Sequence, residues 1–315
     1  VVAAWGLVEG RGRVLGLAAG ALMLTRLDNA LLVAPMLMGH ALRHRDPRPL
    51  LPAAALPLAW AGLSLGYFGH PLPNTFLAKL AQQISLADRL EHGLAWVSNS
   101  ATWDPVTPAV LSLGVVAGGV AARRAPEAAL LALGSLLGVV YAVLIGGDFM
   151  SGRFLAAPLL LAVLAMTRAA VVTPGARIWG PIIGCGALGL SAMNPRSPLR
   201  TDLSYSDVGW DETGIADERG FYFQGQGVLP MLTQGRRPAP PGPQEPTGDT
   251  VLVDRTVGIN GYLAGPNVHL VDRYALTDPL LARLPVRFEG DWRPGHWDRP
   301  IPAGYRATLR SGNMR

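Results

Sequence analysis

The sequence predicts an α-helical multi-pass membrane domain of about seven segments, followed by a small extracytoplasmic α/β domain. Half of the 315 residues are hydrophobic and only 16% are charged, whereas a soluble globular domain carries about 25% charged residues. The charges are also uneven, because residues 1–193 hold 13 basic and 8 acidic residues while residues 194–315 hold 14 of each. All the long apolar runs precede residue 194. We therefore expect domains at 1–193 and 194–315.

Seven apolar runs are the predicted membrane segments. Crossing a bilayer takes about 20 apolar residues, so the first two runs, of 12 and 13 residues, are short. Short helices packed around a thinned, water-filled cavity would explain this. The runs cover residues 14–25, 30–42, 50–68, 106–120, 128–145, 154–167 and 178–193.

The loops between these runs predict the orientation, because cytoplasmic loops collect arginine and lysine. Alternate loops hold nine basic residues, which we place in the cytoplasm: Arg11, Arg13, Arg43, Arg45, Arg48, Arg123, Arg124, Arg168 and Arg177. In the other loops the acidic residues outnumber the basic ones. The sequence therefore predicts a multi-pass plasma-membrane protein whose residues 194–315 lie outside the cell.

The first outer turn, 24–29, reads Leu-Thr-Arg-Leu-Asp-Asn. The two runs beside it are each only about 20 Å long at 1.5 Å per residue, so Arg26 and Asp28 should lie below the membrane surface. Charged groups at that depth usually face a water-filled cavity or a partner. The alternative is a surface turn with a local Arg-Asp pair.

The second outer loop, 69–105, begins Gly-His-Pro-Leu-Pro-Asn-Thr. The two prolines predict an extended entry, after which Asn74 can cap a helix. We expect one amphipathic interfacial helix over 76–96. Lys79, the only lysine, lies one turn inside it and is either a snorkelling interfacial side chain or a ligand-binding cation. His70 and Asn74 are candidate sugar or acceptor contacts, while Trp96 and Trp103 fit an interfacial aromatic belt.

The third outer loop, 146–154, reads Gly-Gly-Asp-Phe-Met-Ser-Gly-Arg-Phe. Its glycines predict a tight turn whose backbone can approach a ligand closely. Arg153 suits a phosphate because guanidinium offers a planar fork of donors. Asp148 and Arg153 either pair with each other or divide the work of a site.

Beyond residue 193 the chain becomes richer in proline and acidic residues, and a Pro/Gly-rich stretch at 236–248 predicts a loop. Strands are expected at 251–254, 256–260 and 268–272, and a helix at 275–283, with Asp278-Pro279 better suited to a helix start than to its middle. The tail 292–305 mixes aromatic and charged residues. His296 and Trp297 are therefore candidates for sugar contact, although such loops also serve as ordinary capping structures.

Several function classes are excluded by composition and motifs. The basic excess lies entirely in the apolar part, which argues against a nucleic-acid partner. The single cysteine, Cys185, cannot form an intrachain disulfide. No nucleotide-binding loop, metal-ligand spacing or nucleophile elbow is present in the sequence. No cofactor is expected with certainty, and a divalent metal is left open.

Four motifs in order give the chain a family resemblance. They are Leu-Thr-Arg-Leu-Asp-Asn, His-Pro-Leu-Pro-Asn-Thr-Phe with Ala-Lys, Gly-Gly-Asp-Phe-Met with Gly-Arg-Phe, and Gly-Tyr-Leu-Ala-Gly-Pro followed by Val-Asp-Arg-Tyr-Ala-Leu-Thr-Asp-Pro. From about residue 11 onward, the chain resembles the actinobacterial terminal β-(1→2)-arabinofuranosyltransferase family of C-type membrane glycosyltransferases. The resemblance implies transfer of an arabinofuranosyl unit from decaprenyl-phosphoryl-arabinose to the ends of arabinan in arabinogalactan and lipoarabinomannan during cell-wall biogenesis.

Two departures from the family pattern matter. The family usually reads Arg-Pro-Asp-Gly at the first turn, whereas this chain reads Arg26-Leu27-Asp28-Asn29. The resemblance also implies an essential acid in a preceding outer loop that these 315 residues do not contain. The chain alone is therefore expected to be inactive, as an amino-terminally shortened enzyme.

The residues and the resemblance together predict an outer-face site under a lipid-embedded donor. Donor-phosphate contact is assigned to Arg26, Lys79 and Arg153, and supporting catalytic roles to Asp28 and Asp148. The alternatives are a C-type transferase using another polyprenyl-phosphate sugar, such as mannose, and a non-catalytic membrane scaffold or transporter subunit. Transporters usually show internal repeats with broken helices, and this sequence shows none.

Overall fold

The computed structural model describes residues 1–80, 84–173, 178–195, 213–218, 228–235, 250–255, 257–286 and 292–311. The described chain is mostly helical, with one two-stranded sheet. It divides into two compact units. The first unit comprises residues 1–71 and 86–203, and the second comprises 72–85 and 204–315. The predicted domain boundary at 193/194 stays a prediction, and the inclusion of 72–85 in the second unit was not anticipated.

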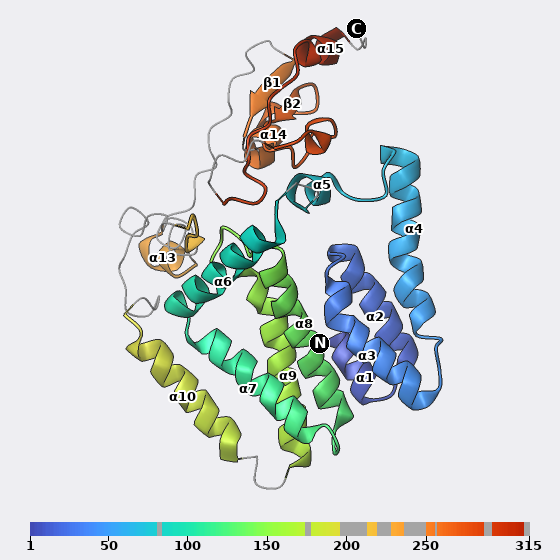
Figure 1. Cartoon of the computed structure of the whole chain (residues 1–315), viewed down its shortest axis with the longest axis vertical. Coiled ribbons are helices and arrows are strands. Elements are labelled where there is room, and N and C mark those ends of the chain that lie inside the picture. Colours follow the sequence, from blue (N-terminus) through green and yellow to red (C-terminus); the bar gives the residue numbers. More distant parts are fainter. Residues whose placement is uncertain are drawn as a thin grey trace. The chain divides into compact units, whose positions relative to one another are not determined.

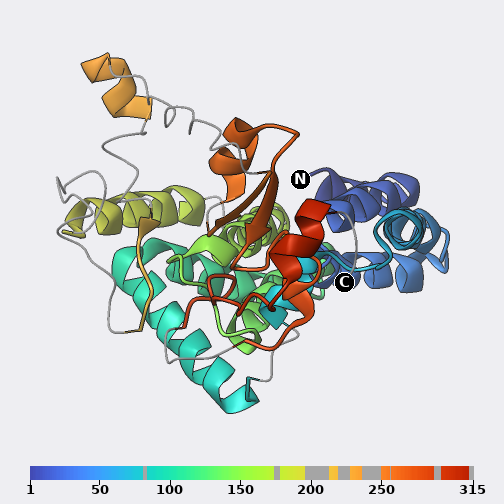
Figure 2. The ribbon, with the colours of Figure 1, turned by 90° about the horizontal axis from the view of Figure 1, so that it is seen from above.

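The first unit contains two groups of helices (Figure 1). The first group is α1 (Val2–Val8), α2 (Gly12–Thr25), α3 (Asn29–His44) and α4 (Leu50–Phe68); the second is α6 (Leu86–Trp103), α7 (Val106–Ala121), α8 (Pro126–Leu144), the short 3₁₀ helix η1 (Arg153–Leu155), α9 (Ala156–Val172) and α10 (Trp179–Met193). Helix α4 packs on α2 and is seen nearly end-on in Figure 2. Helices α7, α8 and α9 pack on one another, and α3 joins the two groups by packing on α8.

Small residues allow these helices to approach closely. A Cβ on Gly114 of α7 would lie 2.5 Å from the Cβ of Ala162 in α9, and a Cβ on Gly118 would lie 2.7 Å from the carbonyl oxygen of Ala128 in α8. The hydroxyl of Ser135 in α8 donates to the carbonyl oxygen of Pro158 in α9 at 2.8 Å. Small interfacial residues and hydroxyl hydrogen bonds are the means by which helices associate in lipid, where no hydrophobic force drives them together.

In the part of the chain that the structure describes, three helices are long and apolar enough to cross a membrane: Leu50–Phe68, Pro126–Leu144 and Arg153–Val172. A fourth span results if α6 and α7, which meet at a 109° bend, are counted together. The bend lies at Asp104-Pro105, where the Asp104 carboxylate accepts hydrogen bonds from the backbone N–H groups of Val106 and Thr107 and from the Thr107 hydroxyl. Helices cover all seven predicted runs. Seven crossings stay a prediction, because α2, α3, α7 and α10 are each shorter than a perpendicular span.

The predicted single helix over 76–96 is wrong. The described chain has α5 (Asn74–Leu80) in the second unit and α6 in the first, and residues 84 and 85 between them are not helical. Ser85 precedes α6 and Asp88 lies in its first turn, a spacing that favours a new helix start over continuation of the previous helix. The amphipathic sequence pattern of residues 76–96 is therefore divided between two helices, α5 and α6.

The second unit is built on a parallel pair of strands, β1 (Val251–Asp254) and β2 (His269–Asp272), with Val253 opposite Val271. Both strands were predicted. The third predicted strand, 256–260, is wrong, because α14 (Val257–Ala264) occupies that stretch. Two adjacent parallel strands need a crossover connection, which is usually a helix. This stretch is therefore helical despite its strand-like composition. The unit also contains α13 (Val228–Gln234) and α15 (Tyr305–Ser311).

The helix predicted at 275–283 is reduced to the 3₁₀ turn η3 (Leu281–Arg283). Two carboxylates hold the backbone in turns instead. Asp272 accepts hydrogen bonds from the N–H groups of Tyr274 and Thr277, and Asp278 accepts from those of Leu280 and Leu281. Asp278-Pro279 therefore precedes the helical turn, as its composition indicated. The predicted loop at 236–248 lies outside the described residues.

Candidate functional site

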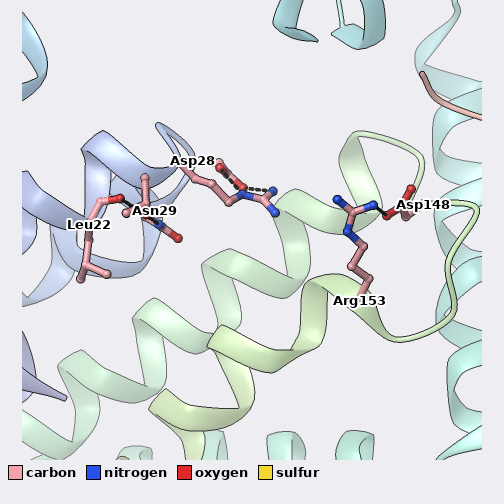
Figure 3. A network of polar contacts seen from close by, with 7 residues as sticks. Leu22, Asp28, Asn29, Asp148 and Arg153 are labelled. Carbon is pink, nitrogen blue, oxygen red and sulfur yellow. Dashed lines mark hydrogen bonds and ion pairs between the residues drawn. The ribbon is translucent and has the colours of Figure 1, made fainter. Parts of the chain in front are cut away.

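Helix α8 and the loop after it bring the first and third predicted outer motifs together in the first unit. The turn between α2 and α3 carries Arg26 and Asp28, and the loop between α8 and α9 carries Asp148 and Arg153 (Figure 3). The Arg26 guanidinium carbon lies 4.8 Å from the centre of the Phe154 ring, which directly follows Arg153. We call these four charged residues the Asp148 end of the unit.

Arg26 and Asp28 form a two-pronged ion pair. Nε of Arg26 donates to Oδ1 of Asp28 at 3.0 Å, and Nη2 donates to Oδ2 at 2.7 Å. This hydrogen bonding raises the pKa of Arg26, against a smaller opposing effect of burial, and the nearby Tyr141 and Asp148 raise it further. Among the described residues, the hydrogen bonds of Arg26 leave its Nη1 available. The guanidinium is fixed, charged and still able to donate.

Asn29 stabilises the turn that presents this pair. Its side-chain amide donates to the carbonyl oxygen of Leu22 at 3.0 Å and to the hydroxyl of Thr25 at 3.2 Å (Figure 3). These bonds satisfy acceptors at the end of α2. The asparagine at position 29 is thus accommodated by local hydrogen bonds.

The third motif forms a second ion pair with a more deeply buried acid. Nη1 of Arg153 lies 3.2 Å from Oδ2 of Asp148, whose side chain is 3% exposed, against 21% for Asp28. Oδ1 of Asp148 accepts the backbone N–H of Phe149 at 3.0 Å. The two arginine side chains are 45% and 43% exposed. In both pairs the carboxylate therefore lies deeper than the guanidinium that it holds.

Helix α6 fixes the shape of the loop around Asp148. Gly147 has a positive φ of 68°, and a Cβ there would lie 2.5 Å from the Cβ of Trp96. The Trp96 indole N–H donates to the carbonyl oxygen of Met150 at 2.8 Å, and the backbone N–H of Gly152 donates to the hydroxyl of Ser100 at 2.9 Å. Only glycine satisfies both the conformation and the close contact at residue 147. The predicted tight turn is therefore held by side chains of another helix.

Sequence reasoning missed the residues that support these pairs. Trp96 was assigned to an interfacial belt, but it is fully buried and packs edge-on against Phe154 at 6.1 Å between ring centres. Phe154 received no role. An aromatic residue directly after a candidate phosphate arginine is the signal that could have drawn attention to the contact with Arg26, since arginine favours aromatic faces.

The remaining predicted site residues lie elsewhere. His70 follows α4 in the first unit, where its carbonyl oxygen accepts the Ser64 hydroxyl at 2.8 Å. Asn74 and Lys79 belong to α5 in the second unit. The Asn74 side-chain amide donates to the carbonyl oxygen of Thr277 at 3.4 Å, and the Lys79 chain lies against Gly295. The site roles of His70, Asn74 and Lys79 stay predictions.

His296 and Trp297 contribute to the packing of the second unit. The His296 ring lies 4.9 Å from that of Tyr274, and Trp297 is buried edge-on against Trp292 at 5.9 Å. Their assignment to sugar contact stays a prediction. Among the described residues, no group of three or more His, Cys, Asp or Glu side chains is placed to hold a metal ion.

Comparison with known proteins finds a distant relative of named activity. The chain is similar to the terminal beta-(1->2)-arabinofuranosyltransferase of Mycobacterium tuberculosis (strain ATCC 25618 / H37Rv), at 26% identity over 85% of this chain and 54% of that protein. The chain thus spans about half the length of this curated relative. No family profile and no solved structure matches it. The likeness supports a distant family relationship.

Proposed function

We propose that this chain is part of a glycosyltransferase of the plasma membrane. In this proposal the enzyme moves an arabinofuranosyl unit from decaprenyl-phosphoryl-arabinose to the ends of cell-wall arabinan. The observation that carries the proposal is the Asp148 end, where two half-exposed guanidiniums are each held by a deeper carboxylate, next to helices able to cross a membrane. The named activity of the distant relative supports the same reaction class.

The charge change in such a reaction explains why two fixed arginines would be useful. The bond between the anomeric carbon and the phosphate oxygen breaks, and the acceptor hydroxyl oxygen bonds to that carbon while its proton passes to a base. The donor phosphate is a diester with one negative charge, and it departs as a monoester with up to two. Guanidinium groups that are already in position therefore stabilise the transition state more than they stabilise the bound sugar donor.

The residues of the Asp148 end receive roles from this chemistry. Arg26 and Arg153 contact the phosphate through the donor groups that their ion pairs leave available. Asp28 and Asp148 hold these guanidiniums in position, which is a supporting role. The proton-accepting base is not assigned to any of these four residues.

The location of the site also fits a lipid-linked donor. A polyprenyl chain must remain in the bilayer while its phosphate and sugar meet a hydrophilic acceptor. The Asp148 end lies just beyond the last turn of α8 and just before α9, two helices able to cross a membrane. We propose that this end and the second unit face the outside of the cell, with seven crossings in the first unit.

The test is transfer from a prenyl-phosphoryl-arabinose donor by the complete gene product carrying Arg153→Ala or Asp148→Ala. Turnover should fall at least tenfold in both variants, since a lost charge-stabilising donor costs about 10²–10³ in rate. The matched control is Arg48→Ala or Asp46→Ala, which removes an exposed pair separated by 3.9 Å and should leave turnover unchanged. Unchanged turnover in both Asp148-end variants would remove this loop from the site.

Donor selectivity is tested in the same assay. A prenyl-phosphoryl-mannose donor should not be used, because the proposal assigns an arabinofuranosyl donor. Phosphate contacts are common to all such donors, so efficient mannose transfer would overturn the sugar assignment while leaving the phosphate site intact. Normal folding without transfer from either donor would favour a non-catalytic membrane scaffold.

A further inference from the structure

A second charged cluster lies at the opposite end of α8. Glu127 lies in the first turn of this helix and is 8% exposed. Its Oε1 contacts Nη1 of Arg43 in the last turn of α3, and its Oε2 lies 3.6 Å from Nη2 of Arg168 in α9. One buried carboxylate is therefore shared by two arginines from two other helices. We call these three residues the Glu127 end.

Packing between buried alanines places two more arginines in this region. Ala121, Ala125, Ala128 and Ala169 form one buried cluster, so the turn between α7 and α8 packs on the same part of α9 that carries Arg168. That turn contains Arg123 and Arg124, both exposed.

The charges of this region do not balance. Arg43, Arg123, Arg124 and Arg168 carry four positive charges and Glu127 carries one negative charge, so these five residues together have an excess of three positive charges. Both arginines also remain partly accessible, since the side chain of Arg43 is 54% exposed and that of Arg168 is 29% exposed. The positive charges of such a cluster repel one another, and a bound anion would reduce this repulsion.

Apolar side chains border the same cluster. Val120, in the last turn of α7, is 80% exposed, and Val171, at the end of α9, is 66% exposed. A free phosphate ion would gain nothing from these valines, whereas acyl chains would cover them. Basic clusters between helices at a membrane surface bind the head groups of anionic lipids.

We propose that Arg43, Arg123, Arg124 and Arg168 form a binding site for the phosphate of an anionic phospholipid. Glu127 keeps Arg43 and Arg168 in place, and the two exposed arginines of the turn complete the contact with the head group. The lipid's acyl chains lie along the exposed ends of α7 and α9. This site is separate from the Asp148 end and does not depend on the proposed transfer reaction.

The test measures binding of phosphatidylglycerol to the detergent-purified protein, by native mass spectrometry and by titration, with phosphatidylcholine as the neutral lipid. Phosphatidylglycerol should bind more tightly than phosphatidylcholine. The double variant Arg123→Gln/Arg124→Gln, which leaves the Glu127 contacts intact, should weaken it about fivefold for each arginine removed. Inorganic phosphate should compete only weakly, because it lacks acyl chains.

Two control variants remove the same charge elsewhere. Arg11→Gln/Arg13→Gln takes two arginines from the same predicted side of the membrane, and Arg306→Gln/Arg310→Gln takes two from α15 of the second unit. Both should retain phosphatidylglycerol binding to within twofold. Equal losses in the first control and the test variant would mean a diffuse surface charge and would overturn the site. Binding unchanged in the test variant, or equal binding of inorganic phosphate, would overturn it as well.

Discussion

The two ends of α8 use arginine and carboxylate in different proportions. At the Asp148 end, two arginines each have their own acid, and both guanidiniums are about half exposed. At the Glu127 end, two arginines share one buried acid that links α3, α8 and α9. The arrangement at the Asp148 end holds two guanidiniums in position, and its charges balance. The arrangement at the Glu127 end links three helices, and positive charges remain in excess. In our proposals, the first end binds the donor phosphate and the second end packs helices together and binds a lipid.

The largest expected effect is on turnover at the Asp148 end. Asp148→Asn should lower transfer about 100-fold, because Arg153 loses the carboxylate that holds its guanidinium in place. Asp28→Asn should cost about tenfold, since Asp28 is more exposed and water can replace part of its contact with Arg26. Transfer kinetics of the complete gene product measure both. An equal or larger loss in Asp46→Asn, whose carboxylate is exposed, would contradict the assignment.

The next effect is on stability at the Glu127 end. Glu127→Gln should lower the free energy of unfolding by about 2 kcal/mol, because a buried contact with two arginines loses its charge while Arg43 can still reach water. Thermal unfolding in detergent measures this. Binding of a prenyl phosphate to the folded variant should be unchanged. Normal stability combined with lost prenyl-phosphate binding would reverse the roles of the two ends.

A smaller effect tests how Arg26 is positioned. Phe154→Leu removes the ring that lies 4.8 Å from the Arg26 guanidinium, and such contacts contribute about 0.5–1 kcal/mol at partly exposed sites. Binding of farnesyl phosphate should weaken about two- to fivefold. Phe68→Leu, at a ring 64% exposed in α4, is the matched control. Equal changes in the two variants would show that the ring acts only through general packing.

The smallest effect lies in the second unit, where Asp298 also contacts two arginines but is 35% exposed. Hydrogen bonds from Arg255 lower the pKa of Asp298, and the charge of Arg273 adds to this. Because the folded pKa is depressed, the contribution to stability is present above the unfolded value of 3.8 and is lost as the pH falls through the lower folded pKa.

Asp298→Asn should therefore cost less than about 1 kcal/mol, since exposed ion pairs contribute little. It should also remove this part of the acid dependence. Hydrogen exchange at the β1 and β2 amides between pH 2 and 5 is the measurement. If Asp298→Asn lowered the free energy of unfolding as much as Glu127→Gln, burial would not explain the different contributions expected of Asp298 and Glu127.

Much of the first unit could be predicted because its signals are local. Apolar runs mark the helices, and Arg26 with Asp28, or Asp148 with Arg153, are close enough in sequence to indicate a pair. The contact between Arg26 and Phe154, and that between Trp96 and the loop at 146–154, join residues far apart in the chain, so no local pattern contains them. The role of Glu127 could likewise not be predicted from the sequence, because its arginine partners lie on two other helices.

The two errors in the second unit have different causes. Residues 256–260 have strand-like composition, but the parallel pairing of β1 and β2 requires a crossover that α14 supplies. The stretch 275–283 has helical composition, but the Asp272 and Asp278 carboxylates capture backbone N–H groups that a helix would need. In the first case tertiary pairing outweighed local preference, and in the second case side-chain hydrogen bonds to nearby backbone groups competed with the helix.

The most direct test of the central claim is a double-mutant cycle on farnesyl phosphate binding with Arg26→Gln, Arg153→Gln and the double variant. If both guanidiniums hold one phosphate, each single change should weaken binding about tenfold, and the second change should cost clearly less once the first is present, since groups that share a partner are not additive. Full additivity, or no loss in either single variant, would show that the two turns do not form one phosphate site.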